Sequence, residues 1–451
     1  MSEAFRIERD PIGDKRVRAD ALYGVQTARA LENFHISGYR IHPQFITAIA
    51  EIKKAAAQTN LALGSLDRAR AEPIIAAADE VIAGQWREHF RLDVFQAGAG
   101  TSYNMNVNEV VANRALEMTG ARRGDYDRIN PNDHVNKSQS SNDVIPTAIR
   151  ITTYRLGSAL LDALRQCGEA FLAKGREFND VVKPGRTHLH DATPMTLGEE
   201  FSAYGRNVHR ASGTLRFALD QLLEVPLGGT AVGNGVNTKS EYASKAVAAL
   251  AVITGLPLTE AADKVQLQQS VGDFVAVSGA VRLIAVELSK IASDLRLLNS
   301  GPHTAIAEIE LPALQPGSSI MPGKVNPAVA EMLNMACFHA IGRDAAIGIC
   351  GEAGQLEVNV MMPYVAFGLF EMIDIMTRAV TTFTDKCVTL VEADRIRCRE
   401  LCERSVGLAA LHNDELGFMG AAELAKQAMD TGRTIDDLLD EHRGRPKNAA
   451  S

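Results

Sequence analysis

The chain has 451 residues and a formal net charge of −8, and its hydrophobic and charged fractions of 46% and 23% are ordinary for a globular protein. The acidic balance argues against nucleic acid as the main partner, and the length allows two or three domains. No apolar run is long enough to cross a membrane, and the first ten residues lack the apolar core of a signal peptide. We therefore expect a cytoplasmic protein without a membrane partner.

The amino-acid usage favours a helical core and reduced thiols. Aromatic residues make up only 5% of the chain, so the core should be built mostly from Ala, Leu, Val and Ile, which suits closely packed helices. Six cysteines lie along the chain without Cys-x-x-Cys spacing, and no nearby His or Cys completes a metal site. Free thiols in a reducing compartment are the interpretation that this pattern favours.

The pattern along the chain predicts three segments, with boundaries near residues 142 and 395. Residues 1–142 combine short helices and loops, including a hairpin that turns at Gly13-Asp14. Residues 143–395 carry the periodicity of a helical bundle. Residues 396–451 form a small helical piece, and we expect its polar tail, from residue 442 onward, to be frayed.

A first cluster of small polar residues occupies positions 98–109. Its glycines allow the backbone to approach a ligand. Thr101 and Ser102 offer hydroxyl groups to such a ligand. Capping of a helix is the alternative interpretation, and taken alone it is the better supported one.

A second cluster occupies positions 132–143, where twelve residues include a single apolar side chain. Pro146 and a long helical pattern follow, so we predict a polar loop that leads into a helix N-terminus. Helix N-termini attract anions, and Ser140, Ser141 and Asn142 crowd hydroxyl and amide groups at this point. A plain solvated loop is the alternative.

The middle of the chain predicts long bundle helices. Apolar residues recur in alternating steps of four and three over 197–225 and over 277–298. The proline-free stretch 147–183 shows a similar stripe. Long helices with short glycine- and proline-bearing connections give an up-and-down bundle, so the predicted fold is mostly α.

A third cluster, at 185–191, contains the pair His188-x-His190 beside Thr187. Such a pair suits a metal site when it lies on a strand with further ligands nearby. Here the flanking sequence predicts helices, and no second set of ligands has the right spacing. A histidine that pairs with a carboxylate fits better.

A fourth cluster lies at 317–327, where two glycines and two prolines exclude a helix and predict a mobile loop. The loop carries two hydroxyls, Ser318 and Ser319, together with the ammonium of Lys324 and the amide of Asn326. Such groups suit the binding of a carboxylate while a serine does chemistry.

The predicted bundle helices have apolar positions on more than one side. A single isolated bundle of this length would leave part of that surface in water. Since exposed apolar patches mark interaction surfaces, we expect oligomerisation through the bundle.

The four clusters together resemble a known family. Residues 317–327 read GSSIMPGKVNP and meet every fixed position of GSSxMPxKxNP, the signature of the fumarase/aspartase superfamily. The other three clusters are similar to the superfamily's conserved blocks, in the same order. Residues 23–34, 97–102 and 352–357 resemble the aspartase branch. Ser141, where aspartases usually have Thr, is a fumarase-like departure.

The resemblance implies a three-domain, mostly α fold whose central long-helix bundle forms the core of a homotetramer, with sites shared between subunits. It implies reversible deamination of a dicarboxylate, L-aspartate, to fumarate and ammonia, without a metal or an organic cofactor. By the same resemblance, Ser318 is the catalytic base and His188 a second catalytic residue. The substrate-binding positions that it implies are Thr101, Ser102, Ser140, Ser141, Asn142, Thr187, Ser319, Lys324 and Asn326.

Four alternatives stay open on the sequence. A fumarate hydratase would release water from malate, and a related lyase would act on a substituted aspartate. A non-catalytic relative is the alternative from another class, against which the retained polar residues argue. A metal-dependent hydrolase is the weakest candidate.

Overall fold

The structure is a computed structural model that describes residues 4–444. It divides into two compact units, each made of several stretches of the chain. The first unit contains the described residues up to Leu160 together with Thr214–Arg282 and His339–Ile375, and the second contains Leu161–Gly213, Leu283–Phe338 and the described residues from Met376 onward. Nowhere in residues 4–444 does a helix have both the length and the apolarity that a membrane crossing requires.

The hairpin predicted near the N-terminus is confirmed, but its turn is formed by Pro11 and Ile12, and the predicted turn residues Gly13 and Asp14 begin its second strand. Strand β1 (Phe5–Asp10) pairs antiparallel with β2 (Gly13–Arg18), and Asp10 faces Gly13 at the turn. The Oδ1 atom of Asp10 accepts hydrogen bonds from the amides of Ile12 and Gly13 at 3.0 and 3.2 Å. This side-chain bonding to nearby amides is what favours aspartate at turns.

The shorter helices of the first unit pack around α2 (Pro43–Ala62), which contacts α3, α4 and α7. Pro43 suits the start of α2, because the first amide of a helix has no intrahelical partner to lose. Phe45 of α2 contacts Tyr103 and Phe370 in an aromatic cluster. The other helices of this group are α1 (Val25–Asn33), α3 (Arg68–Ile82), α4 (Thr101–Met118), α7 (Tyr242–Thr254) and α8 (Lys264–Gln269).

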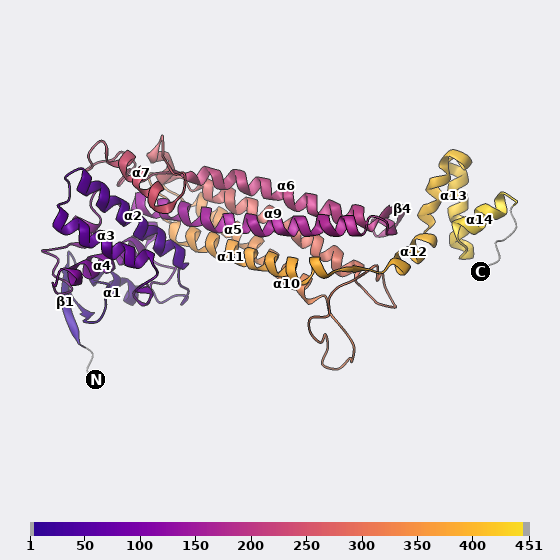
Figure 1. Cartoon of the computed structure of the whole chain (residues 1–451), viewed down its shortest axis with the longest axis horizontal. Helices are drawn as coiled ribbons and strands as arrows, with labels where there is room; N and C mark the ends of the chain where they lie inside the picture. Colours follow the sequence, from indigo (N-terminus) through magenta and orange to yellow (C-terminus); the bar gives the residue numbers. More distant parts are fainter. Residues whose placement is uncertain (1–3, 445–451) are drawn as a thin grey trace. The chain divides into compact units, whose positions relative to one another are not determined.

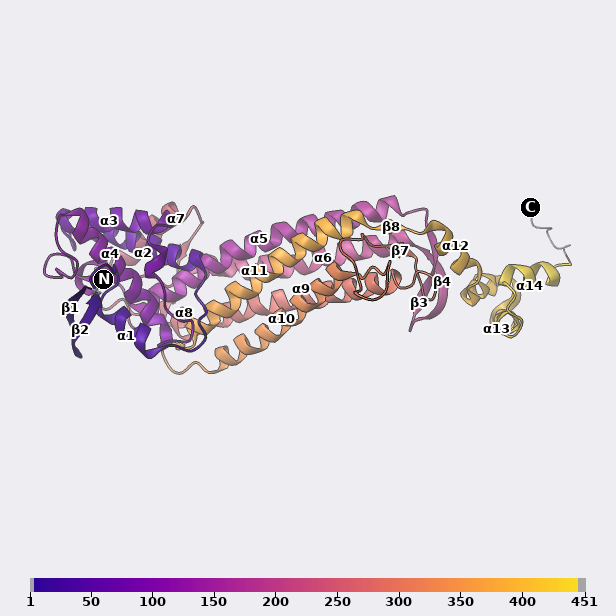
Figure 2. The same cartoon turned by 90° about the horizontal axis from the view of Figure 1, so that it is seen from below.

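Long helices run side by side in both views (Figures 1 and 2) and contribute to both units. Their presence confirms the predicted mostly α architecture with long bundle helices. These helices are α5 (Ser141–Glu177), α6 (Leu197–Asp220), α9 (Gly272–Leu298), α10 (Ala328–Glu352) and α11 (Met362–Lys386).

Helix α6 ends earlier than its apolar stripe suggested, at Asp220 and before Leu222 and Val225. The chain is extended at Glu224 and Val225, directly before Pro226. The residue before a proline disfavours helical geometry, so the helix does not continue through Val225. Helix α5 ends at Glu177, within the proline-free stretch 147–183.

Aromatic side chains form the core of the second unit. Phe171 of α5 lies against Phe201 and Tyr204 of α6 and against Phe383 of α11, with ring centroids 5.7 to 6.0 Å apart. The three phenylalanines are fully buried. Tilted and edge-to-face contacts of this kind add to the stability that their burial provides.

The described part of the chain ends in four small helices, α12 (Arg395–Glu403), η6 (Val406–His412), α13 (Asn413–Thr431) and α14 (Ile435–His442). The last three share an apolar cluster of their own. Leu424, Ile435 and Leu439 belong to that cluster. The predicted frayed tail lies mostly outside the described residues, and the segment boundaries near residues 142 and 395 stay predictions.

A close backbone contact in the second unit allows a stability prediction. A Cβ atom added at Gly407 would lie 2.1 Å from the carbonyl oxygen of Ala192 in strand β4 (His190–Thr196), so any side chain there must push η6 away from β4. We expect Gly407→Ala to lower the free energy of unfolding by about 1–3 kcal/mol. The matched change Gly213→Ala meets nothing within 4 Å and should be neutral or stabilising by up to about 1 kcal/mol. Urea unfolding measures both, and equal midpoints would contradict the prediction.

Candidate active site

The first polar cluster forms a tight turn at the start of α4. Ala99 and Gly100 both have left-handed backbones, with φ of 56° and 74°. The amide of Ala99 donates to the carbonyl oxygen of Val360 at 2.8 Å, and Cβ atoms added at Gly98 or Gly100 would come within 2.9 and 3.0 Å of Val360 and Ile145. The turn is therefore packed too closely for larger residues.

Thr101 and Ser102 follow this turn as the first residues of α4. The N-cap residue is Gly100, and no side chain makes a capping hydrogen bond at this helix start. The capping interpretation of the two hydroxyls is therefore wrong. Thr101 is exposed and Ser102 half-buried, so both hydroxyls stay accessible to a ligand.

The second cluster leads into α5 as predicted, and Ser140 caps that helix. The hydroxyl of Ser140 accepts a hydrogen bond from the amide of Asn142 at 3.2 Å, and the carboxylate of Asp143 accepts one from the amide of Ser140 at 2.9 Å. This reciprocal pair fixes the first turn of a 37-residue helix. The positive end of its dipole thus lies at Ser140, Ser141 and Asn142, where an anion is favoured.

Behind this helix start lies a buried polar network. Asp143 is fully buried, and its second carboxylate oxygen accepts hydrogen bonds from the amides of Gly228 and Thr230 at 3.1 and 2.9 Å. Burial raises the pKa of Asp143 to about 6, against the lowering effect of its amide donors and of Lys53. Asn142 reaches the same loop, since its Nδ2 atom donates to the carbonyl oxygen of Ala231 at 2.8 Å.

The third cluster lies on strands, so the prediction of helical flanks there is wrong. Strand β3 (Val182–Thr187) pairs antiparallel with β4 (His190–Thr196), and His188 and Leu189 form the two-residue turn between them. Both turn residues have left-handed backbones, with φ of 56° and 60°. That is the geometry of the tight hairpin turns that match strand twist. Proline and glycine before the turn hid the strand pattern.

This hairpin exposes the predicted site residues Thr187 and His188. Within residues 4–444, no set of three or more His, Cys, Asp or Glu side chains lies where it could hold a metal ion. The strand context that a His-x-His site needs is therefore present without further ligands around it.

Charged side chains hold the base of the hairpin in place. The Nη2 atom of Arg186 donates to the Oε1 atom of Glu308 at 2.7 Å, and the Nζ atom of Lys183 lies 3.2 Å from the Oε2 atom of the same carboxylate. Glu308 is fully buried. Glu308 precedes the loop at 317–327 in the chain. The ion pairs therefore join the third cluster to the segment just before the fourth cluster.

The fourth cluster is a loop, as predicted, and it is closed on itself. The amide of Gly317 donates to the carbonyl oxygen of Lys324 at 2.8 Å, and the Nδ2 atom of Asn326 donates to the carbonyl oxygen of Gly317 at 2.8 Å. A Cβ atom at Gly317 would lie 2.6 Å from that Lys324 oxygen. Asn326 is thus a loop-closing residue in this structure, and the side chain of Lys324 is exposed.

Ser318 lies inside this closed loop and is half-buried. Its Oγ atom accepts hydrogen bonds from the amides of Ile320 and Met321 at 3.2 and 3.0 Å. Donors that point at an oxygen favour its negatively charged form. Ser319 beside it is exposed and free to meet a ligand.

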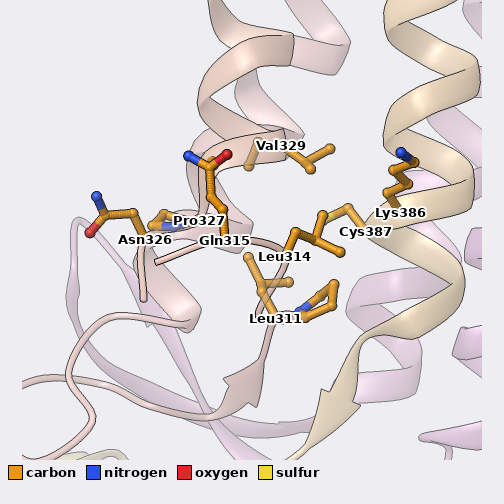
Figure 3. A pocket seen from close by; sticks show the side chains of 11 residues that line it. Leu311, Leu314, Gln315, Asn326, Pro327, Val329, Lys386 and Cys387 are labelled. Atoms are coloured by element: carbon orange, nitrogen blue, oxygen red, sulfur yellow. The ribbon is translucent and has the colours of Figure 1, made fainter. Parts of the chain in front are cut away.

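The foot of the loop is apolar. Figure 3 shows Leu311, Leu314 and Val329 lying around a small pocket, with Cys387 and Lys386 at its other side. A second cleft, of about 1120 Å³, is lined by residues 321–325 and 392–396 among others. Residues 319–325 of the loop are exposed.

The site residues fall into two groups within the chain. Thr101, Ser102, Ser140, Ser141 and Asn142 belong to the first unit, and the residues of the third and fourth clusters belong to the second unit. Within the described part of the second unit, Thr187 and His188 make no hydrogen bond to the loop at 317–327. The predicted site residues are therefore divided between the two units.

Comparisons with known proteins identify the family. A family model described as lyase matches residues 13–342. Aspartate ammonia-lyases from Bacillus subtilis (strain 168) and Escherichia coli (strain K12) are 46% and 44% identical to the chain, over 97% of this chain and 92% of each relative. The chain belongs to this lyase family.

Solved structures of the lyase family agree in fold. The chain resembles a fumarate lyase:delta crystallin from Brucella melitensis bound to cobalt, with a TM-score of 0.95 and 44% identity over 97% of this chain and 96% of that one. It also resembles a class II fumarase from Schistosoma mansoni, with a TM-score of 0.94 and 33% identity over 98% and 96%. The predicted fumarase/aspartase type of fold and the prediction of a lyase are confirmed.

Sequence reasoning missed two buried charged residues of this lyase, Lys53 and Glu308. Lys53 follows Ile49 by four positions, so it occupies the apolar face of α2, where a lysine is unusual. A lysine on an apolar helix face could therefore have indicated a buried charge. Glu308 had no comparable signal, because its partners Lys183 and Arg186 lie more than a hundred positions earlier in the chain.

Proposed function

We propose that this chain catalyses the reversible deamination of L-aspartate to fumarate and ammonia. The observation that carries the proposal is the 317–327 loop, which holds the Ser318 oxygen under two amide donors. Relatives named aspartate ammonia-lyase, at 44–46% identity over almost the whole chain, support aspartate as the substrate.

The chemical difficulty is the removal of a proton from the carbon beside a carboxylate that is already negative. The product of that step is an aci-carboxylate, which carries two charges on one group. Catalysis then requires hydrogen-bond donors that are in place before the charge develops. The hydroxyls and amides of the four clusters, the dipole of α5 and the ammonium of Lys324 are donors of this kind.

In the proposed mechanism Ser318 is the base. A free serine hydroxyl is far too weakly acidic to supply an alkoxide near neutral pH, so its environment must favour the charged form. The two loop amides that donate to Oγ contribute to stabilising that charged form. Closure of the loop over the substrate would exclude water and bring Lys324 near the anionic groups.

We assign the other predicted site residues to the two carboxylates and the amino group of the substrate. We assign Thr187, Lys324 and Asn326 to one carboxylate, and Asn142 and His188 to the amino group or an adjacent carboxylate oxygen. Ser102, which follows Thr101 at the start of α4, is assigned as a further donor. The carboxylate that becomes the dianion is assigned to Thr101, Ser140, Ser141 and Ser319.

We further propose that the active form is a homotetramer in the cytoplasm and that it needs no metal or organic cofactor. The substrate's own carboxylate accepts the electrons of the broken C–H bond, so the reaction requires no other electron sink. Exposed apolar side chains on the bundle helices, among them Met335, Phe338 and Ile349, support association through the bundle. The partial sets of site residues would then be completed by other subunits.

Hydration of fumarate is the second candidate function. It is favoured by the fumarase-like sequence Ser140-Ser141-Asn142 and by the similarity to the Schistosoma mansoni fumarase structure. The ultraviolet absorbance of fumarate measures both reactions. We expect fumarate to form from L-aspartate far faster than from L-malate. Faster formation from malate would reverse the proposal, and no fumarate from either would point to a substituted aspartate.

A further inference from the structure

Glu308 is a buried acid that the proposed mechanism does not use. Its side chain is fully buried, and its Oε1 atom accepts a hydrogen bond from the Nη2 atom of Arg186 at 2.7 Å. The Nζ atom of Lys183 lies 3.2 Å from the Oε2 atom of the same carboxylate. A buried carboxylate is costly unless cations compensate it. Glu308 therefore holds two cations of one strand, β3, which an apolar residue of the same size could not do.

The backbone of Glu308 is fixed by other parts of the second unit. Its amide donates to the carbonyl oxygen of Leu298, the last residue of α9, at 2.9 Å, and its carbonyl oxygen accepts from the amide of Asp394 at 3.0 Å. The next residue, Ile309, pairs with Ala393. The carboxylate thus extends from a point that is held on two sides, so it can serve as a fixed anchor for β3.

The hairpin of β3 and β4 needs an anchor of this kind. It is a sheet of only two strands, and such a hairpin is marginally stable by itself. Its register shifts between Pro184 and Arg186, and a proline cannot donate to the ladder. Thr187 directly follows Arg186 and pairs with His190 as the last pair before the turn. The ion pair of Arg186 therefore acts one residue from the hydroxyl of Thr187.

The charges around Arg186 and Lys183 are balanced. Lys183 has a second carboxylate partner, Glu200 of α6, whose Oε2 atom lies 2.9 Å from its Nζ atom. Arg186 has no ion-pair partner other than Glu308 within residues 4–444. Loss of the Glu308 charge would leave the Arg186 guanidinium, whose side chain is 16% exposed, without a counter-charge. It would then turn toward water and draw the end of β3 with it.

We propose that Glu308 is a positioning residue, which fixes the turn at Thr187 and His188 through Arg186 and so sets the affinity for a substrate carboxylate. The inference rests on the proposed function, which assigns Thr187 to one carboxylate of the substrate. Because Glu308 is fully buried, it acts through Arg186 and not through contact with the substrate. Its charge is expected to matter for binding, since the charge is what holds Arg186.

Glu308→Gln tests the proposal, because it keeps the size of the side chain and removes the charge. Succinate is a suitable probe, since it is a dicarboxylate without a leaving group, and titration calorimetry measures its affinity without turnover. We expect Glu308→Gln to bind succinate roughly tenfold more weakly than wild type. Glu169→Gln is the matched control, because Glu169 is an exposed acid that pairs with Arg165 along α5, and it should bind as wild type. Equal affinity in Glu308→Gln and wild type would overturn the proposal.

A double-mutant cycle with Thr187→Ala distinguishes positioning from general damage. If Glu308 acts through the turn, the two substitutions disturb the same contact with the carboxylate, so their effects are not additive. The double variant should lose clearly less affinity for succinate than the product of the two single losses. A loss equal to that product would show independent effects and contradict the proposal. In the aspartate assay, Glu308→Gln should raise KM more than it lowers kcat, and an unchanged KM would contradict it as well.

Folding of the variants and binding by wild type are measured separately. Wild type that does not bind succinate would contradict the proposed function itself, and this inference with it, whereas wild type that binds leaves the comparison of variants decisive. Circular dichroism and gel filtration establish that each variant is folded. If Glu308→Gln does not fold, Arg186→Met cuts the same link and leaves Glu308 paired with Lys183. Arg186→Met should then bind succinate roughly tenfold more weakly, and wild-type affinity would overturn the proposal.

Discussion

Ser318→Ala is expected to abolish turnover while folding and assembly stay intact. The substitution removes the only atom that the mechanism uses to take the proton from carbon, and loss of a single preorganised donor already costs about 10²–10³ in rate. We therefore expect a decrease in kcat of at least about 10³. The Ser318 hydroxyl accepts hydrogen bonds from two loop amides and does not belong to the hydrophobic core. The change in the free energy of unfolding should therefore be small.

The fumarate absorbance assay measures this loss, and gel filtration with urea unfolding measures assembly and stability. Ser244→Ala is the matched control, because Ser244 is an exposed hydroxyl on α7 that bonds only to its own helix. It should keep wild-type activity. Near-normal turnover by Ser318→Ala would show that another group is the base.

Lys324→Ala is expected to weaken substrate binding more than it slows the chemical step. The ammonium is exposed on the loop and lacks an ion-pair partner within residues 4–444, so it is available to a substrate carboxylate. A hydrogen bond to a charged group contributes about 1.5–3 kcal/mol. The apparent KM for aspartate should therefore rise by roughly 10- to 150-fold.

Steady-state kinetics over a range of aspartate concentrations separate KM from kcat. Lys245→Ala is the matched control, because Lys245 is an outward lysine on α7 that pairs with Glu241 in the preceding turn. Its KM should not change. An unchanged KM in Lys324→Ala would contradict the role of this ammonium as a carboxylate clamp, whatever happened to kcat.

The elements that could be predicted from the sequence are those fixed by local chemistry. The N-terminal hairpin and the long α9 were visible because turn residues and apolar periodicity act over a few positions, although the turn itself lies at Pro11-Ile12 and not at Gly13-Asp14. The loop at 317–327 could be predicted from its glycines and prolines. The catalytic role of Ser318 was predicted through resemblance to a family. The amides that donate to its hydroxyl could not be predicted, because they depend on how the loop folds.

The strands at the third cluster could not be predicted in the same way. Lys183-Pro184-Gly185 breaks the alternating pattern expected of a strand, and β3 is held by its pairing with β4 and by the ion pairs of Arg186 and Lys183 with the distant Glu308. Contacts between residues so far apart in the chain leave no periodic signal.

The central claim is that hydroxyls and a cation from separate subunits gather around one dicarboxylate. Mixing two inactive variants tests it most directly, with Thr101→Ala altering a site residue of the first unit and Ser318→Ala one of the second. If different subunits supply these residues, subunits that are unfolded together and refolded as a mixture form some sites with neither substitution.

The measurement is fumarate formation from aspartate by the refolded mixture, compared with each variant refolded alone. Random assembly of equal amounts leaves both residues intact in about one quarter of the sites, so we predict roughly a quarter of the activity of refolded wild type. Activity that does not rise above that of the separate variants, although gel filtration shows mixed oligomers, would contradict a site in which Thr101 and Ser318 come from different subunits.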